Sequence, residues 1–444
     1  MASFASGGDN NRLNKSSILL MLLLLDGLAL ASDGGSYLFV ASAFVSLVVL
    51  SFHLYSGTLL IRLSSYWHFG FILIVCLEGI LYSDAISAAY GEYRYNEASR
   101  YLVAANASFL VASYLISSSK YGSFNRHYLA EKNETAKILI VVLSVLYIVY
   151  HASSAFRALY FGRSVTLERE KDLNVILEGV MESAGIVIPA AFVYLRGLYR
   201  NSVKYAIGAI FILPILVIQI AIGTRYIFLV SIAAAGLVWY FTTTSKSKKS
   251  ILLVFVLAMV AILTTMKSAR SAGLLSESRE STFDMVPLSE LSEGVVDKMA
   301  MIVSLVEQRG VKFGQSSAAI LVFYIPRVLW REKPELLGYT LIRDFGGENP
   351  GKYHSVSYTF AGDFYVDFGL YGGLLCCFIL GLVFGKIENL TATAILSGNR
   401  YAIIASAAFG MTFFAVRSLN TAIIAMSGVV LVGAFIARTI RCRQ

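Results

Sequence analysis

Basic side chains gather in one segment late in the chain, where they could bind an anion. The stretch IPRVLWREKP, residues 325–334, carries Arg327, Arg331 and Lys333 among apolar residues and between two prolines. Arginine forks match phosphate oxygens with paired hydrogen bonds, and lysine adds a compact charge. Trp330 would help to hold this segment against a membrane. The pattern favours a phosphate-binding segment at a membrane surface, and the alternative is an interfacial helix with ordinary surface charges.

Two residues that could accept a proton follow in KYHSVSYTFAGDFYVDFGLYGG. His354 can act as a general base near neutral pH, and Asp363 can do so if an apolar wall tunes its carboxylate. A solvated loop histidine is the alternative for the former. Tyr358 lies between them and offers a flat face and a hydroxyl of the kind that hold sugar rings, although membrane interfaces also enrich tyrosine.

Other charged residues lie inside or at the ends of apolar segments, where charge is costly and is usually paired or functional. Arg225 in IGTRYIFL and Arg417 in FFAVRSLN could each meet an anionic headgroup, or could simply snorkel from a helix end. The acidic candidates are Asp26, Glu78, Glu178, Glu182 and Asp367. Glu178 and Glu182 share one helical face and predict either a buried ion pair or a polar cavity.

The composition indicates a membrane protein. Of the 444 residues, 57% are apolar and 15% are charged, against about 25% charged in soluble domains. The net charge of +9 fits cytoplasmic loops and lipid headgroups, and no nucleic-acid partner is expected. Four cysteines without a C-x-x-C or a His/Cys cluster predict neither a disulfide framework nor a metal site. Because nucleotide-binding and hydrolase motifs are also absent from the sequence, no cofactor is expected.

Twelve apolar runs are candidates for crossing about 30 Å of hydrocarbon, although the first is short, and they predict an all-α, polytopic membrane protein. They are 17–32, 36–55, 67–84, 101–118, 136–155, 174–195, 203–222, 226–243, 250–266, 364–385, 401–416 and 419–437. Most lysines and arginines of the short connections lie inside if the N-terminus is inside. Both termini are therefore predicted to be cytoplasmic. Residues 1–266 would hold nine spans, 267–363 one large extracytoplasmic loop, and 364–444 three spans and a basic tail.

The predicted outer loop contains two apolar patterns. From Val286 to Val306, apolar residues recur every three or four positions with charged residues between them, which predicts an amphipathic helix. Residues 313–324 form a second apolar segment that is too short to span and is stopped by Pro326. We expect this second segment to lie in the membrane interface or to dip into it.

With these features, the chain resembles the oligosaccharide repeat-unit polymerases of bacterial envelopes, the Wzy-type O-antigen polymerase family. The resemblance rests on IPRVLWREKP, SVSYTFAGDFYVDFGLYGGLL, GTRYIFL and AVRSLN, and on the many spans with one large outer loop late in the sequence. It implies a GT-C-like fold in the bacterial inner membrane. It also implies a membrane glycosyltransferase that joins undecaprenyl-pyrophosphate-linked oligosaccharides into O-antigen or a related surface polysaccharide.

The same resemblance implies roles for residues. Arg225, Arg327 and Arg331 would bind the donor pyrophosphate and stabilise its developing charge without a metal. His354 or Asp363 would deprotonate the acceptor hydroxyl. Further substrate-binding candidates are Lys333, Arg417 and Tyr358. The expected partners are the lipid-linked donor and acceptor, membrane lipids and a chain-length regulator protein.

Two other functions fit the sequence. An O-antigen ligase would look much alike, with a lipid core oligosaccharide as its acceptor. A lipid-linked oligosaccharide flippase or transporter would explain the span count and the intramembrane acids. Transporters are often built from two similar halves, whereas here one loop of roughly a hundred residues breaks any such symmetry.

Overall fold

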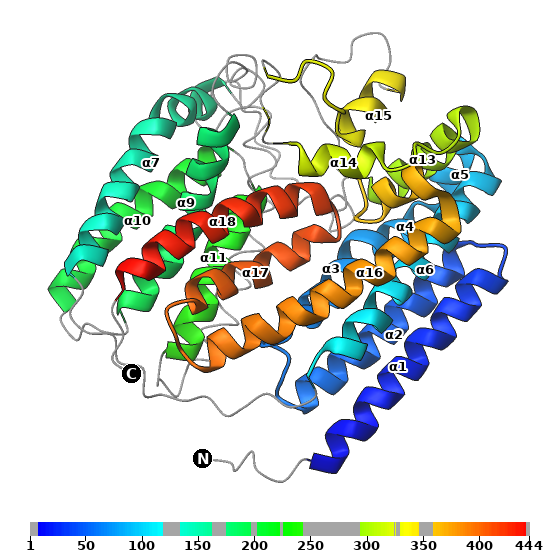
Figure 1. Ribbon diagram of the computed structural model, residues 1–444, viewed down its shortest axis with the longest axis horizontal. Coiled ribbons are helices and arrows are strands. Elements are labelled where there is room, and N and C mark those ends of the chain that lie inside the picture. The colour runs from blue at the N-terminus through cyan, green and yellow to red at the C-terminus, as the bar shows by residue number, and fades with distance from the viewer. Residues whose placement is uncertain are drawn as a thin grey trace. The chain divides into compact units, whose positions relative to one another are not determined.

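The computed structural model describes residues 8–118, 134–161, 175–196, 202–222, 225–242, 294–323, 325, 329–345 and 358–440. Every regular element in these ranges is a helix, as Figure 1 shows. Within the described residues, five helical stretches are long and apolar enough to cross a membrane, namely Ser36–Tyr55, Leu63–Leu81, Thr135–Ala158, Gly362–Leu396 and Leu419–Thr439. The prediction of a helical membrane protein is confirmed.

The predicted spans mostly coincide with described helices. Residues 250–266 lie outside the described residues, and the other predicted segments fall on helices to within a few residues. Several of these helices are shorter apolar ones, such as Gly179–Leu195 and Ala402–Ala415. The number of twelve spans therefore stays a prediction.

Contacts divide the chain into two compact units, a division that the order of the apolar runs does not predict. The first unit comprises residues 1–123, 287–392 and 412–423, and the second comprises residues 124–286, 393–411 and 424–444. Helices α17 (Ala402–Ala415) and α18 (Leu419–Thr439) contribute to both units, and the turn that joins them belongs to the first.

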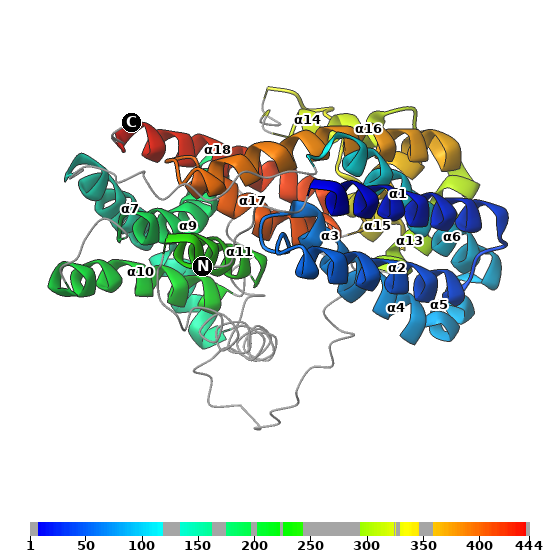
Figure 2. The same cartoon turned by 90° about the horizontal axis from the view of Figure 1, so that it is seen from below.

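The first unit is built around α6 (Glu92–Ile116), whose residues are almost all buried from Tyr95 to Tyr114. Helices α1 (Gly8–Ala31), α2 (Ser36–Tyr55) and α5 (Ser83–Tyr90) pack against it, as does α13 (Val295–Arg309). Figures 1 and 2 both show α1 and α2 beside α6. The central helix is therefore enclosed by protein on several sides.

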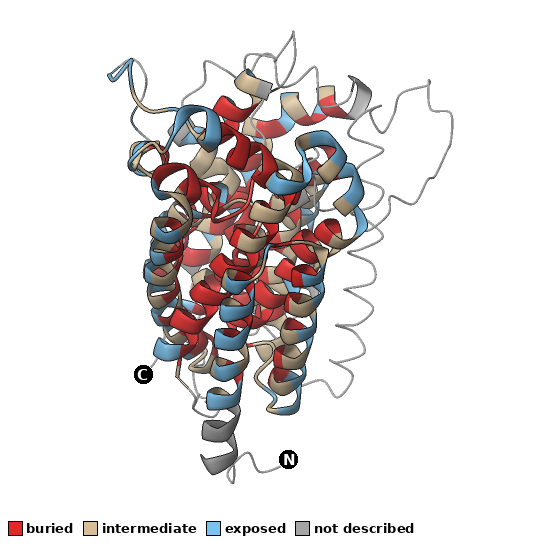
Figure 3. Ribbon diagram, turned by 90° about the vertical axis from the view of Figure 1, so that its right-hand side faces the viewer, coloured by how far each residue is buried: buried red, intermediate tan, exposed pale blue. Residues whose placement is uncertain are grey.

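Many outer helix faces are apolar while polar side chains point inward. On α2, Phe44 and Leu47 are exposed whereas Ser42 and Ser46 are buried. Figure 3 shows exposed residues along the outer helices and buried residues between them. This pattern is typical of helices surrounded by lipid, where polar groups gather inside the bundle.

A continuous helical stretch of the first unit runs from Leu63 to Leu81. It consists of α3 (Leu63–Phe71), a π-helical turn (Ile72–Cys76) and α4 (Leu77–Leu81). The Trp67 indole stacks on the Phe109 ring of α6 at 4.1 Å between centroids. This stacking holds the helical stretch 63–81 against α6.

Helix α16 (Gly362–Leu396) contains a break at Gly369, where φ is 69° and ψ is −164°. After the break, a row of glycines packs closely on α6. A Cβ on Gly373 would lie 2.5 Å from the Tyr101 hydroxyl, and one on Gly381 would lie 2.1 Å from the Phe109 carbonyl oxygen. Higher-numbered residues of α16 thus meet higher-numbered residues of α6, so the two helices run in the same direction here.

Before the break, the chain runs the opposite way along α6. The Phe360 ring lies 5.8 Å from the Phe109 ring, and the Tyr365 ring lies 4.7 Å from the Tyr101 ring, between centroids. Phe109 and Tyr101 are eight residues apart, which is about 12 Å along a helix. The segment that precedes Gly369 therefore enters the bundle beside α6 and turns back at this glycine. The predicted span 364–385 includes part of this short segment.

The described part of the predicted outer loop is largely helical. Helix α13 confirms the predicted amphipathic helix from Val295 onward, and residues 286–293 lie outside the described residues. Helix α14 (Gln315–Leu321) is the short second segment, and α15 (Leu337–Phe345) follows it. Side chains of Phe313 and Leu321 are highly exposed, as an interfacial position would require.

The second unit contains α7 (Glu134–Phe161), α9 (Val175–Arg196), α10 (Ser202–Ile222) and α11 (Arg225–Thr242), and α9 packs against α7, α10 and α11. Gln219 Nε2 and Ser231 Oγ both donate to the Gly185 carbonyl at 3.1 Å. The Tyr226 hydroxyl donates to Glu182 at 3.3 Å. The side chain of Glu178 lies outside the described residues.

Candidate functional site

One predicted site residue, Asp363, is the centre of a buried polar cluster in the first unit. It lies in the first turn of α16 and is 2% exposed. Its Oδ1 accepts hydrogen bonds from Ser316 Oγ at 2.5 Å and from the Tyr358 hydroxyl at 3.0 Å. Its Oδ2 accepts one from Asn420 Nδ2 at 2.9 Å. Three separate chain segments thus converge on a single carboxylate.

Tyr358 and Asn420 are also bound to each other. Asn420 Nδ2 lies 2.5 Å from the Tyr358 hydroxyl oxygen, so both hydrogens of this amide are used within the cluster. Burial and the nearby Asp363 carboxylate raise the pKa of Tyr358 well above its usual range. The phenol therefore stays protonated and remains a donor to Asp363.

Backbone contacts bring these segments together. The Phe360 amide donates to the Val416 carbonyl at 3.1 Å, which joins the segment before α16 to the turn between α17 and α18. A Cβ on Gly70 would lie 3.0 Å from the Phe413 carbonyl and 3.3 Å from the Val416 side chain. This close packing seats the turn against α3, seven residues after that helix begins. Two non-helical turns therefore meet inside the helix bundle.

Asp367, one turn after Asp363, binds the start of α14. Its Oδ1 accepts from the Ser316 amide at 2.9 Å, and its Oδ2 accepts from the Ser317 amide at 2.7 Å and the Ser317 hydroxyl at 2.6 Å. These are the backbone donors that a helix start leaves without intrahelical partners. Ser316 thus contacts both aspartates and fixes α14 on the short segment of α16.

Two other buried acids also bind helix starts. Glu78 accepts from the Val295 and Val296 amides at 2.8 and 2.9 Å, at the start of α13. Glu388 accepts from the Ser64 amide at 2.7 Å at the start of α3 and pairs with Arg62 at 3.3 Å. A negative charge is favourable at a helix N-terminus, where backbone amides lack intrahelical partners, and this explains why Glu78 and Glu388 lie there. Glu78 and Asp367, which the sequence left open, are therefore structural contacts in the described part of the chain.

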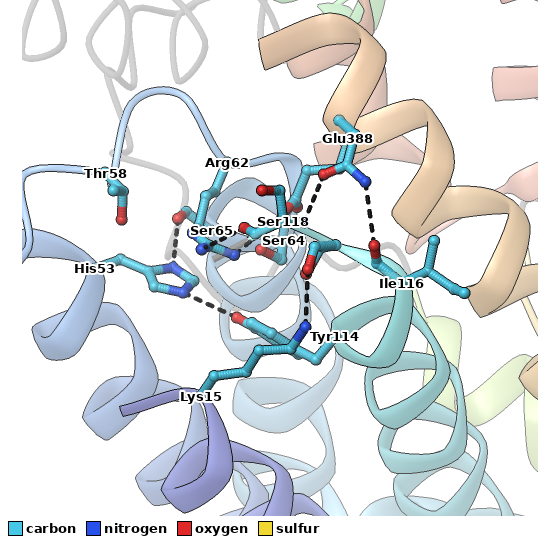
Figure 4. A network of polar contacts seen from close by, with 12 residues as sticks. Lys15, His53, Thr58, Arg62, Ser64, Ser65, Tyr114, Ile116, Ser118 and Glu388 are labelled. Atoms are coloured by element: carbon cyan, nitrogen blue, oxygen red, sulfur yellow. Dashed lines mark hydrogen bonds and ion pairs between the residues drawn. The ribbon is translucent and has the colours of Figure 1, made fainter. Parts of the chain in front are cut away.

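Figure 4 shows the contacts around Glu388. Lys15 Nζ donates to the Ser117 carbonyl at 2.9 Å, and Arg62 Nη2 donates to the Ser118 carbonyl at 3.1 Å. These cations satisfy carbonyls at the C-terminal end of α6, where the helix dipole favours positive charge. The network joins α1, α3, α6 and α16 at one end of the unit. Lys15, Arg62 and Glu388 therefore have a structural role there.

Several predicted site residues lie outside the described residues. These are His354 and Arg327, together with the side chain of Arg225, whose backbone begins α11 in the second unit. Arg331 is exposed and belongs to the first unit. The predicted grouping of Arg225, Arg327 and Arg331 therefore stays a prediction.

The remaining predicted residues are described. Lys333 Nζ donates to the Phe323 and Ile325 carbonyls, each at 2.8 Å, so its ammonium group stabilises the turn after α14. Arg417 lies in the turn between α17 and α18, three residues before Asn420, and is partly buried. Tyr358 and Asp363 are in direct contact. The structure thus joins Tyr358 and Asp363 with the turn that carries Arg417.

Sequence reasoning missed Ser316, Ser317 and Asn420. The serines stand in FGQSSAAI just before an apolar run, a position typical of helix starts. The four-residue spacing of Asp363 and Asp367 places both on one helical face, which could have indicated a shared partner. Asn420 carries no such local signal, because its role depends on a contact across 57 residues of chain.

The cluster can orient groups, but in this arrangement it does not present Asp363 to a substrate. Asp363 is enclosed and accepts three side-chain hydrogen bonds. Its carboxylate fixes Tyr358, four residues after His354, and Asn420, three residues after Arg417. A positioning role for Asp363 therefore follows from the geometry more directly than the role of a general base.

No protein-family model, curated protein or solved structure matches this chain. Function is therefore inferred from the residues and geometry of the chain itself.

Proposed function

We propose that this protein polymerises polyprenyl-pyrophosphate-linked oligosaccharide repeat units by glycosyl transfer on the outer face of the bacterial cytoplasmic membrane. One observation supports this most. Asp363 binds Tyr358 and Asn420 inside the first unit, so YTFAGDF and AVRSLN, which belong to segments that carry the resemblance to repeat-unit polymerases, meet around one carboxylate. Segments joined in this way can act on one ligand.

In the proposed reaction, a hydroxyl oxygen of the acceptor sugar attacks the anomeric carbon of the donor glycan. The bond between that carbon and the pyrophosphate oxygen breaks, and its electron pair leaves with the polyprenyl pyrophosphate. The hydroxyl proton passes to a general base. Because the energy resides in the donor linkage, the reaction requires no nucleotide, and arginines can stabilise the leaving group.

The proposed roles divide between positioning and contact. His354 is the proposed base, and Asp363 is a positioning residue that fixes Tyr358, four residues after His354. Asn420 fixes the turn that carries Arg417, which would contact the pyrophosphate together with Arg327 and Arg331. Lys333 would stabilise the basic segment through the Phe323 and Ile325 carbonyls that it binds.

The test is reconstitution of the purified full-length protein in vesicles with a lipid-linked repeat unit, in the presence of EDTA. We expect a ladder of glycans on the lipid carrier, since neither metal nor nucleotide takes part in the proposed step. Transfer to a lipid core oligosaccharide without any ladder would indicate a ligase instead. Activity that returns only with added magnesium or manganese would contradict the proposed leaving-group stabilisation.

Transport of a lipid-linked oligosaccharide is the second candidate, and one observation favours it. Non-helical turns that meet inside a helix bundle, here before Gly362 and at residues 416–418, are typical of substrate sites in transporters. The same vesicles distinguish the two functions. A flippase would make a fluorescent lipid-linked unit accessible on the opposite leaflet and would leave its length unchanged.

A further inference from the structure

A group of polar side chains lies across the short segment of α16 from the Asp363 cluster. Tyr365, two residues after Asp363, faces α6, where its ring packs on Tyr101. Its hydroxyl lies 3.4 Å from Glu97 Oε1 on α6. Arg100, also on α6, lies 3.5 Å from Glu97 Oε2. Neither contact is used by the mechanism proposed above.

The hydrogen bonds of Glu97 and Arg100 are incompletely formed. The two contacts of Glu97, at 3.4 and 3.5 Å, are longer than the roughly 2.5–3.2 Å of good hydrogen bonds. Glu97 is nevertheless mostly buried, with 13% of its side chain exposed. Arg100 Nε is buried and has no acceptor among the described residues. Because buried charges are normally well hydrogen-bonded, Glu97 and Arg100 each have capacity for a hydrogen bond to a ligand.

A second ion pair and an aromatic ring extend the group toward solvent. Arg94 Nε contacts Glu307 of α13 at 2.7 Å, and both side chains are about one-third exposed, at 37% and 34%. Tyr93, next to Arg94, is 68% exposed. Tyr93 and Glu307 both lie close enough to Tyr365 to act on it electrostatically. The ion pairs and the two tyrosines therefore form one continuous patch, which we call the Glu97 patch.

The charges of the Glu97 patch select a class of ligand. It holds two carboxylates, Glu97 and Glu307, and two guanidinium groups, Arg94 and Arg100, so neither an anion nor a cation is favoured overall. A hydroxyl group can donate to a carboxylate and accept from a guanidinium at the same time. A neutral, hydroxyl-rich ligand would thus complete the bonds of Glu97 and Arg100, and a tyrosine face suits the apolar side of a sugar ring.

We propose that the Glu97 patch is a saccharide-binding subsite, which holds part of the glycan while Asp363, on the other side of the same short segment, positions the reacting groups. The subsite depends on the proposed function for its role in polymerisation, but its binding of glycan is measurable without catalysis. Tyr93 supplies the stacking surface, and Glu97 and Arg100 bind hydroxyl groups.

The experiment measures binding of a defined probe to the full-length protein in detergent. The probe is the surface glycan of the parent cells, released from its lipid, size-fractionated and labelled at its reducing end. Variants Tyr93→Ala, Tyr93→Phe and Glu97→Gln report on the patch. Tyr55→Ala and Arg343→Gln are matched controls, since Tyr55 is 88% exposed at the C-terminal end of α2, and Arg343 of α15 forms an exposed ion pair with Glu335, which precedes that helix.

We expect Tyr93→Ala and Glu97→Gln each to weaken glycan binding about tenfold, whereas Tyr93→Phe and both controls bind as the wild type does. Tyr93 is exposed, so its variants do not depend on refolding of a core. In reconstituted polymerisation, Tyr93→Ala should shorten the longest products while the first linkage still forms. Equal glycan affinity in wild type, Tyr93→Ala and Glu97→Gln would overturn the proposal. Glycan binding by a protein that does not polymerise would retain the subsite and refute the proposed function.

Discussion

Replacing Gly381 by alanine should separate α16 from α6 and thereby disturb the Asp363 cluster. A Cβ at this position would lie 2.1 Å from the Phe109 carbonyl oxygen and 2.9 Å from the Ala112 side chain. Real Cβ atoms do not approach a backbone oxygen so closely, and backbone cannot rotate away as a side chain can. The two helices must therefore move apart by about 1 Å. Overpacking of this kind costs about 1–3 kcal/mol.

The same displacement reaches the candidate site through a known contact. The Tyr101 hydroxyl of α6 donates to the Ala361 carbonyl at 3.0 Å, two residues before Asp363. A separation of about 1 Å would break this hydrogen bond. We therefore expect lower activity in the reconstituted polymerisation as well as lower stability.

The assay is thermal unfolding of the purified protein in detergent, with Gly27→Ala as the matched control. Gly27 also lies inside a helix, and a Cβ there would meet nothing within 4 Å. We expect Gly381→Ala to lower Tm by about 1–3 °C, because an unfolding entropy of about 2.1 cal/mol/K per residue gives roughly 1 °C per kcal/mol for a chain of 444 residues. Gly27→Ala should leave Tm unchanged or raise it, because alanine favours the helix. Equal Tm values for the two variants would refute the inferred close packing of α16 on α6.

Three further predictions test other contacts. Glu78→Gln should destabilise the protein by about 0.5–2 kcal/mol, since it weakens the cap on α13, and a denaturant titration at constant detergent would detect this; no change would mean that the cap contributes nothing. Burial and the Asp297 carboxylate raise the pKa of Tyr90 to about 12, above the usual 10 of an unfolded chain. Between these two pH values the folded state keeps a proton that the unfolded state loses, so the free energy of unfolding should fall as pH rises from about 10 to about 12. The fall should be smaller in Tyr90→Phe. In a background without Cys76, Cys376, Cys377 and Cys442, an impermeant maleimide should label a cysteine at Tyr339 of α15 in intact cells but not one at Tyr55 of α2; the reverse labelling would invert the predicted orientation.

The sequence predicted the helical elements well because their signal is local. Long apolar runs separated by polar connections indicate helices whatever surrounds them, and α2 and α7 follow the predicted runs closely. The amphipathic pattern likewise predicted α13, although its start is set by a distant residue, Glu78. The position of a helix end can depend on a capping residue that is distant in sequence, and local hydropathy does not identify that residue.

The reversal at Gly369 was not predicted, for a related physical reason. Apart from Asp367, the run from Phe364 to Phe378 contains apolar residues and glycines, so hydropathy alone reads it as one span. The left-handed φ of Gly369 interrupts the helix there, and only packing against Tyr101 and Phe109 shows that the chain turns back.

The candidate site was predicted in part. Asp363 and Tyr358 were singled out by residue type, and they are in contact. The expectation that Asp363 would serve as a base took no account of Ser316 and Asn420, which enclose it. Their involvement follows from tertiary contacts across 47 and 57 residues of chain. Residue type thus indicated the location, whereas the hydrogen-bond partners of Asp363 depend on tertiary contacts.

The most direct test of the account is a double-mutant cycle on the Asp363 cluster, measured as the rate of glycan extension in reconstituted vesicles. The four proteins are the wild type, Tyr358→Phe, Asn420→Ala and the double variant, compared at equal amounts of folded protein. Each single change removes a hydrogen bond to a charged group, worth about 1.5–3 kcal/mol, and should slow extension at least tenfold. Because both side chains act through Asp363, the double variant should be little slower than either single one. If the two single changes add in activation free energy, so that their rate effects multiply, the cluster does not work as one unit. Single variants that extend glycan at the wild-type rate would contradict it as well.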